Sequence, residues 1–283
     1  PGGLTRALLA TNAVKVIAIE RDRRFIEALQ DVIEASQGRL SIVEADALTV
    51  DPEDLAPAPR AIVANLPYNI ATPLLLGWLA RIEAYVSLTL MFQKEVAQRI
   101  VARPGASAYG RLAVLAQATC EAALVMEAPA RAFTPPPKVD SAVVRLTPRP
   151  DRPPGPLLDA LQTLTQAAFG QRRKMLRSGL KPVGGEALCA AAGIDPSRRA
   201  ETLTWTVFVL ARSWRDGEER RGGPDQPGAY ALLDALRTAL AGRQPFEDAG
   251  PLAFERQQAL LFAQGLVVYA AAYALTQHHH ADR

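Results

Sequence analysis

Short apolar runs alternate with amphipathic stretches over the first part of the chain. The β-branched run 14–20 predicts a buried parallel strand, and the stretch from Asp22 to about Ala35 predicts a helix with one apolar face. The same alternation predicts strands at 40–43, 61–64 and 85–91, and helices at 72–82 and 94–102. Strands that alternate with helices are typical of βαβ units, so we expect an α/β fold around a parallel sheet.

The pattern changes after Tyr109. A helix is predicted near 112–119, followed by strands at 123–127 and 141–146. The Pro-rich loop 133–138 joins these two strands, so we expect an antiparallel hairpin at the edge of the sheet.

Two linkers divide the chain. Residues 147–156 (TPRPDRPPGP) predict a stiff linker at a domain boundary, and residues 215–228 predict a second linker. Residues 229–276 predict two amphipathic helices, one of them over Arg256–Leu275. We therefore expect three parts: an α/β domain, a small all-α domain, and a linker with a helical extension, at 1–147, 157–214 and 215–283.

Composition and cysteine usage exclude several classes of protein. With 49% apolar and 22% charged residues, the chain of 283 residues is typical of a globular protein. Its two cysteines are far apart and form no CxxC pair, so we expect neither a disulfide framework nor a metal site, and a reduced, cytoplasmic setting fits. The consecutive His278–His280 predict a solvated tail. No apolar run is long enough to predict a membrane span, and we expect no signal peptide.

Positive charge is concentrated in one segment. The net charge is only +3, but residues 171–181 carry five basic side chains and no acid. Such a run is either a solvated helix face or a surface that faces phosphates. The five residues are Arg172, Arg173, Lys174, Arg177 and Lys181.

Two acids and two glycines stand where nucleotide-binding folds hold their ligands. Glu20 ends the first predicted strand, where an acid can accept hydrogen bonds from ribose hydroxyls, and Asp46 follows the next strand. Gly2 and Gly3 precede a predicted helix, where a Gly-rich turn can approach a ligand closely. Each signal is weak alone, since acids often follow strands and a Gly pair is often simply a turn.

The segment Asn65-Leu66-Pro67-Tyr68 is the strongest chemical signal. It directly follows a predicted strand, at the sheet edge where ligands bind. An adenine amino nitrogen is a poor nucleophile, because its lone pair is delocalised into the ring. The Asn65 side chain and a backbone carbonyl of Leu66 or Pro67 can hold its two N–H groups, and Tyr68 can stack on the extruded base. The alternative is an ordinary turn at a strand end.

Nine stretches of the chain, in order, resemble the ribosomal RNA adenine N6,N6-dimethyltransferase family. They span residues 1 to about 214. The matching stretches are PGGLTRALL (1–9), IERDRRF (19–25), EADAL (44–48), NLPYNIATPLL (65–75), MFQKEVAQRI (91–100), AYGRLAVLAQ (108–117), FTPPPKVDSAVVRL (133–146), FGQRRKMLRSGL (169–180) and AETLTWTVFVLAR (200–212).

The resemblance implies a Rossmann-like class I methyltransferase sheet, S-adenosylmethionine as cofactor and small-subunit ribosomal RNA, in an immature particle, as partner of a monomer. It implies that Gly2, Gly3, Glu20, Asp46 and Asn65 bind the cofactor. Asn65 to Tyr68 would form the methyl-transfer motif, and Phe133 would pack on the adenine opposite Tyr68, although Phe133 is alternatively a core anchor. Residues 171–181 would form a basic helix, and this helix and the small helical domain would bind RNA.

Three departures from the family lead to further expectations. The family's first strand and leading glycines are not found ahead of Gly2, which predicts a gap in the core and poor cofactor binding. The segment 204–207 lacks the family's more acidic helix start, and residues 215–283 match nothing in the family. Two alternatives to the RNA-modifying enzyme therefore remain. One is a non-catalytic RNA-binding assembly factor that keeps the fold, and the other is a DNA adenine methyltransferase. Leu66 and the FTPPPKVDS loop favour RNA over DNA as the substrate.

Overall fold

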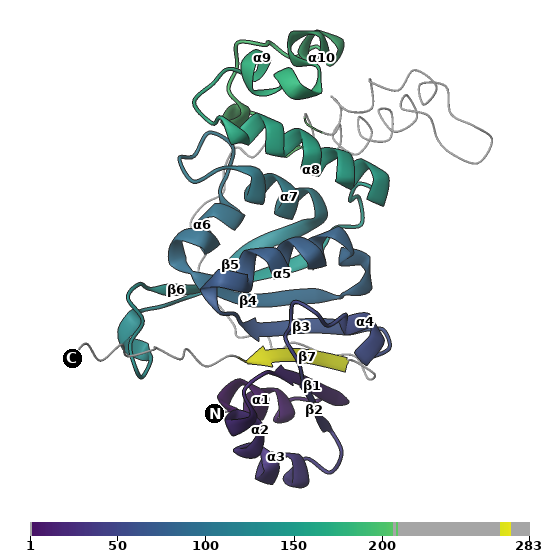
Figure 1. Cartoon of the computed structure of the whole chain (residues 1–283), viewed down its shortest axis with the longest axis vertical. Coiled ribbons are helices and arrows are strands. Elements are labelled where there is room, and N and C mark those ends of the chain that lie inside the picture. Colours follow the sequence, from purple (N-terminus) through teal and green to yellow (C-terminus); the bar gives the residue numbers. More distant parts are fainter. Residues whose placement is uncertain (1, 206–207, 209–266, 273–283) are drawn as a thin grey trace, which may run out of the picture. The chain divides into compact units, whose positions relative to one another are not determined.

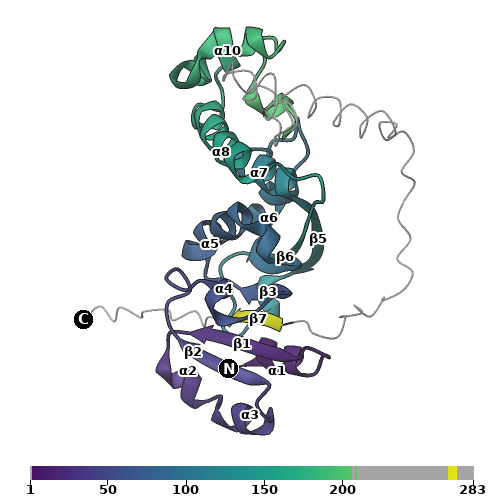
Figure 2. The ribbon, with the colours of Figure 1, turned by 90° about the vertical axis from the view of Figure 1, so that its right-hand side faces the viewer.

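The computed structural model describes residues 2–205, 208 and 267–272 (Figures 1 and 2). The chain forms two compact units, which are described separately below. Residues 1–155 and 262–283 belong to the first unit, and residues 156–261 to the second. The predicted linker 215–228 and the His278–His280 tail lie outside the described residues.

The first unit is built on a mixed sheet. Among the described residues its strands follow the order β2-β1-β7-β3-β4-β6-β5. The neighbours from β2 to β4 are parallel, whereas β6 is antiparallel to both β4 and β5. The strands are β1 (Lys15–Glu20), β2 (Leu40–Glu44), β3 (Arg60–Asn65), β4 (Ser87–Gln93), β5 (Cys120–Ala128), β6 (Ser141–Pro148) and β7 (Val267–Ala272). The expected α/β fold and its edge hairpin are confirmed.

Most helices of this unit lie where the sequence predicts them. The helix expected from Asp22 to Ala35 is two helices, because Leu29 leaves helical backbone geometry (φ −103°, ψ 1°) and buries its side chain. The next predicted helix begins at Tyr68, not near Thr72. The helices are α1 (Gly3–Leu9), α2 (Arg23–Glu27), α3 (Gln30–Ala35), α4 (Pro52–Leu55), α5 (Tyr68–Ala80), α6 (Lys94–Val101) and α7 (Arg111–Thr119), with single 3₁₀ turns at Ile82–Ala84 and Ala130–Ala132.

Strand β7 comes from the far end of the chain and lies in the middle of the sheet. Its residues pair in parallel register with β1 from Lys15 to Ile19 and with β3 from Arg60 to Asn65. The gap expected at this position is therefore wrong, since β7 pairs the backbones of both neighbours. The helix expected over Arg256–Leu275 is wrong at residues 267–272, and its remaining residues lie outside the described ones.

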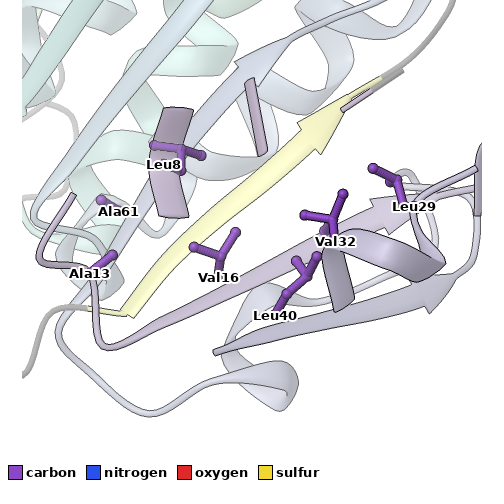
Figure 3. Packing of buried hydrophobic residues seen from close by; sticks show 8 residues of the cluster. Leu8, Ala13, Val16, Leu29, Val32, Leu40 and Ala61 are labelled. Atoms are coloured by element: carbon purple, nitrogen blue, oxygen red, sulfur yellow. The ribbon is translucent and has the colours of Figure 1, made fainter. Parts of the chain in front are cut away.

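A core cluster packs beside this central strand. It joins residues of α1, β1, α3, β2 and β3, and Figure 3 shows the ribbon of β7 running between Val16 of β1 and Ala61 of β3. Helix α1 lies against β1 and β7. Residues 16–19 of the predicted buried run 14–20 are buried, whereas Val14 is 54% exposed. The cluster comprises Leu8, Ala13, Val16, Ala18, Leu29, Val32, Leu40 and Ala61.

The described part of the second unit consists of short helices, as the sequence predicts. They are α8 (Gly155–Gly170), α9 (Leu176–Gly179) and α10 (Gly185–Ala191), with 3₁₀ turns at Lys181–Val183 and Ala200–Thr202. None of the helices within the described residues is long and apolar enough to cross a membrane.

The basic segment 171–181 is not one helix, which corrects that expectation. Helix α8 ends at Gly170, and residues 171–173 form a turn. The Leu176 and Arg177 N–H groups then donate to the carbonyls of Arg198 (2.7 Å) and Pro196 (3.0 Å). These long-range bonds are made by the first two residues of α9, and the bend before them is extended at Met175 (φ −66°, ψ 155°).

Candidate active site

Glu20 and Asn65 lie at the same edge of the sheet. They are the last residues of β1 and β3, and the carboxyl ends of parallel strands point the same way. Strand β7 lies between them, and its last residue, Ala272, pairs with Asn65. With a strand spacing of about 4.8 Å, the two backbones are roughly 10 Å apart. This edge is where α/β folds bind ligands.

Glu20 is a buried carboxyl held in a fixed position. It is 6% exposed, and its Oε1 accepts hydrogen bonds from the N–H groups of Arg21 (2.8 Å) and Asp22 (2.9 Å). Burial raises the pKa of Glu20, and the two backbone bonds oppose that rise. Among the residues that the structure describes, Oε2 accepts no hydrogen bond, so this oxygen is available to a ligand hydroxyl.

Asp46 lies two residues beyond β2, at the same edge and closer to solvent than Glu20. Its Oδ1 accepts from the Leu48 N–H at 3.0 Å, which fixes the turn after the strand. Its Oδ2 lies 3.4 Å from Nη1 of Arg21, the residue that follows Glu20. Arg21 is exposed and the ion pair is long, so it is a weak constraint on Asp46.

Gly2 and Gly3 begin the helix that lies against β1 and β7. Gly2 has φ +81°, and a Cβ at this position would overlap Cδ2 of the buried Leu29. Gly2 is therefore required by backbone conformation and by packing together. An added Cβ at Gly3 would meet nothing within 4 Å, so space remains beside the first turn of α1.

A pocket of about 230 Å³ opens beside the end of β3. This volume is below the roughly 300–1,000 Å³ of drug-sized sites, and it suits one planar group. The Asn65 side chain is exposed and faces this pocket, not the core. The lining residues are Asn65, Leu66, Pro67, Tyr68, Met91, Phe133, Thr134, Pro135, Pro137 and Ser141.

The two aromatic residues predicted for the site both line this pocket. Tyr68 is the first residue of α5 and Phe133 follows the turn Ala130–Ala132. Both are half-buried, so part of each ring faces the pocket. The Pro67 carbonyl already accepts the N–H groups of Ile70 and Ala71, each at 3.1 Å. Pro67 therefore starts α5, and the Leu66 carbonyl is the one left to face a ligand.

Met91 and Ser141 lie within the family-like stretches of the sequence, but no role is predicted for either from the sequence. Met91 pairs with Asn65 across β3 and β4, and it is half-buried where Leu90 and Phe92 beside it are buried. This alternation along β4 was the signal that Met91 faces the Asn65 side of the edge. Oγ of Ser141 lies within hydrogen-bond distance of the Tyr68 hydroxyl. No local pattern predicts this contact, because the two residues are distant in sequence.

The basic residues of the second unit lie apart from one another along the bend. Arg173, Lys174, Arg177 and Lys181 are exposed, whereas Arg172 forms an ion pair with Glu201 at 3.0 Å. Four of the five expected cations thus face solvent. The groups of His, Cys, Asp and Glu among the described residues include none that could hold a metal ion.

Comparison with known protein families shows to which family the chain belongs. The family model for ribosomal RNA adenine dimethylases matches residues 1–211. The chain belongs to this family. The match ends before β7, so the central strand of the sheet comes from outside the part that the family model matches.

Curated relatives and solved structures of the dimethylase family agree with this match. The chain is 61% identical to ribosomal RNA small subunit methyltransferase A of Phenylobacterium zucineum over 216 residues, which are 76% of this chain and 75% of that protein. The corresponding protein of Caulobacter vibrioides is 57% identical over 221 residues, 78% of this chain and 85% of that protein.

Two solved structures resemble the dimethylase chain in fold. A dimethyladenosine transferase from Plasmodium falciparum matches with a TM-score of 0.62 and 27% identity, over 74% of this chain and 84% of that one. The 23S rRNA methyltransferase ErmE matches with a TM-score of 0.57 and 26% identity, over 76% of this chain and 87% of that one. Both confirm the methyltransferase fold.

Proposed function

We propose that this chain transfers methyl groups from S-adenosylmethionine to the N6 amino groups of adenines in small-subunit ribosomal RNA, dimethylating two adjacent adenines. The observation that carries the proposal is one pocket, at the carboxyl edge of the sheet, that combines the exposed Asn65 amide with the Tyr68 and Phe133 rings. Its size and its aromatic walls suit an extruded base, and its amide suits the base's amino group.

Asn65 and Leu66 are proposed to hold the amino group. The Asn65 side-chain oxygen accepts one N–H, and the Leu66 carbonyl accepts the other, since the Pro67 carbonyl is used in α5. Two acceptors at this nitrogen favour a pyramidal geometry, in which its lone pair is available for attack. No general base of shifted pKa is needed for this role, because catalysis comes from positioning and from tighter binding of the transition state.

The carboxyl edge fits the cofactor, which supplies an electrophilic methyl group when bound. Glu20 offers a free, rigidly held Oε2 for the ribose hydroxyls, and Asp46 is placed beyond the next strand for the adenine amino group. Gly2 and Gly3 would form the turn that lies beside the cofactor, and space is present beside Gly3. Asn65 ends its strand at the level of Glu20, which supports a role for it beside both the cofactor and the base.

The second unit is proposed to bind the RNA. The exposed Arg173, Lys174, Arg177 and Lys181, together with Arg172, can contact phosphates and so select which adenines reach the pocket. We further propose that the substrate is an immature small subunit, that the protein acts as a monomer, and that it works in the cytoplasm, where such particles are assembled.

Radiolabelled methyl transfer tests this function. Unmethylated small-subunit particles, bare ribosomal RNA and duplex DNA are compared as acceptors, with Asn65→Ala as the inactive variant. Asn69→Ala is the matched control, because Asn69 is an exposed amide in the first turn of α5, close to Asn65 in the sequence and outside the pocket. We expect transfer to adenine N6 of the particle, a loss of roughly 100- to 1,000-fold with Asn65→Ala, and wild-type activity with Asn69→Ala.

Two other outcomes would contradict the proposal. Transfer to duplex DNA in preference to the particle would make the protein a DNA adenine methyltransferase. Tight binding to the particle with no transfer by the wild-type chain would make it a non-catalytic assembly factor.

A further inference from the structure

We propose that Ser141 is a positioning residue, which holds the Tyr68 ring at a set separation from Phe133 and thereby fixes the width of the base slot. The inference rests on the proposed function, since it assigns Tyr68 and Phe133 as the two walls around the adenine. Its central observation is a single contact: the Tyr68 hydroxyl lies 3.1 Å from Oγ of Ser141, a hydrogen bond in which either group can donate.

Ser141 is held by the sheet on both sides. It is the first residue of β6, an inner strand, and it pairs with Gln93 of β4 and with Ala128 of β5. It is 1% exposed, so its hydroxyl has no access to bulk water. A side chain anchored in this way has a nearly fixed Oγ position, unlike a hydroxyl on a loop.

Tyr68 is held at its two ends by different elements. Its backbone is fixed by Pro67, whose carbonyl accepts the first hydrogen bonds of α5, and its hydroxyl is fixed by Ser141. Without the second anchor the half-buried ring can turn about its side-chain bonds into the pocket. With both anchors, the plane on which a base stacks is set before the base arrives, which is what preorganised catalysis requires.

The opposite wall is tied to the same point of the chain. Phe133 lies in the loop between β5 and β6, and Asp140 closes this loop by accepting the Ala130 N–H at 2.9 Å through Oδ1. The Asp140 carbonyl also accepts the Lys94 N–H at 2.9 Å, which fixes Asp140 to the end of β4. Asp140 thus anchors the Phe133 loop, and its neighbour Ser141 anchors Tyr68. The positions of both rings therefore depend on two consecutive residues at the start of β6.

A comparison of Tyr68→Phe, Ser141→Ala and the double variant tests this role. Tyr68→Phe keeps the ring and removes only the hydroxyl. We expect each single variant to lower kcat about ten-fold with little change in KM, because about one net hydrogen bond is lost where the transition state forms. The double variant should be no worse than either single one, since both remove the same contact.

A spectroscopic readout separates positioning from stability. With 2-aminopurine in place of the target adenine, stacking against Tyr68 quenches the fluorescence, so the bound RNA should be brighter with Tyr68→Phe or Ser141→Ala than with the wild type. Ser141→Thr keeps the hydroxyl and should restore quenching and kcat. Ser36→Ala is the matched control, because Ser36 is another buried, hydrogen-bonded serine outside the pocket. It should lower the melting temperature and leave fluorescence and kcat unchanged.

Three results would overturn the inference while the proposed function stands: full activity of Tyr68→Phe, additive losses in the double variant, or a loss with Ser141→Ala that is matched by the loss of folded protein. An inactive wild-type chain on ribosomal particles would instead overturn the proposed function itself.

Discussion

Glu20 and Asn65 end two strands that lie on either side of β7, at one level of the sheet. Ile19 and Ala64, the residues just before them, both pair with Ala271. The proposed ribose-binding acid and the proposed amino-binding amide therefore lie at the same edge of the sheet. Each ends a strand that is a direct neighbour of β7. Their separation is set by β7, which comes from the other end of the chain, so the proposed cofactor site depends on β7 as well as on the family's own motifs.

Cofactor affinity should fall on acidification because of Glu20. Burial raises the pKa of Glu20 above its ordinary value of 4.5, so its carboxylate is protonated at a higher pH than that of a free glutamate. A protonated carboxyl is a weaker acceptor for ribose hydroxyls. Isothermal calorimetry with S-adenosylmethionine should show affinity that is lost as the pH falls through this raised value.

Glu20→Gln should remove this pH dependence and weaken binding roughly 10- to 100-fold, the usual value of hydrogen bonds to a charged group. The fold should be slightly more stable in Glu20→Gln at neutral pH. A raised acid pKa means that ionisation destabilises the folded state above that pKa, and that the penalty disappears as the pH falls below 4.5. Glu44→Gln, an exposed acid at the same edge, is the control and should bind normally. Unchanged affinity in Glu20→Gln would exclude the ribose role.

Gly2→Ala and Gly3→Ala should have opposite effects on stability. Gly2→Ala places a Cβ in the left-handed region and against Leu29, so the free energy of unfolding should fall by about 1–2 kcal/mol. Gly3→Ala has no steric conflict in the protein and improves helix propensity, so stability should hold or rise. Urea unfolding measures both changes. Gly3→Ala should nevertheless weaken cofactor binding in calorimetry, and normal binding would show that Gly3 is not beside the cofactor.

Ala270→Pro should disrupt the centre of the sheet. Ala270 pairs with Ala18 of β1 and Val63 of β3, and proline has no N–H to donate. The free energy of unfolding should fall by at least roughly 1–3 kcal/mol, the cost of one unpaired buried backbone group, and cofactor affinity should fall with it. Ala270→Ser, which keeps the backbone N–H, is the control and should stay close to the wild type.

The wild-type chain is expected to bind S-adenosylmethionine with micromolar affinity. Poor binding would follow from an open gap between β1 and β3, but β7 occupies that position. If Ala270→Pro has the same free energy of unfolding and the same cofactor affinity as the wild type, β7 contributes nothing to the sheet in solution.

Arg173→Ala and Lys174→Ala should weaken RNA binding without preference for sequence. Both side chains are exposed on the bend after α8. Each phosphate contact removed should lower the slope of log affinity against log salt concentration by about 0.7–0.9. Lys15→Ala, an exposed cation on β1, should leave the slope unchanged. Equal salt slopes for the wild type and the Arg173→Ala Lys174→Ala double variant would show that the basic segment is only a solvated surface.

Much of the site was predictable because it depends on local sequence. Glu20 and Asn65 could be predicted at strand ends because each closes a short β-branched, apolar run. Such runs favour buried strands through their local sequence alone. The start of α5 was missed because Pro67 both ends the strand segment and accepts the first helical hydrogen bonds, which moves the helix four residues earlier. The basic segment was taken for a helix because its composition resembles one, whereas its N–H groups bond to residues about twenty positions later.

The amino-acid sequence by itself determined which segments become strands and which polar residues end them, since hydrophobic periodicity and strand-end chemistry act over a few neighbours. It also determined the family, through motifs in a fixed order. Only the tertiary structure decided that 267–272 is the central strand and that Ser141 meets Tyr68. Both outcomes depend on pairing between residues far apart in the chain, and a short apolar run such as VVYAAA suits a helix or a strand until the partners that need its hydrogen bonds are in place.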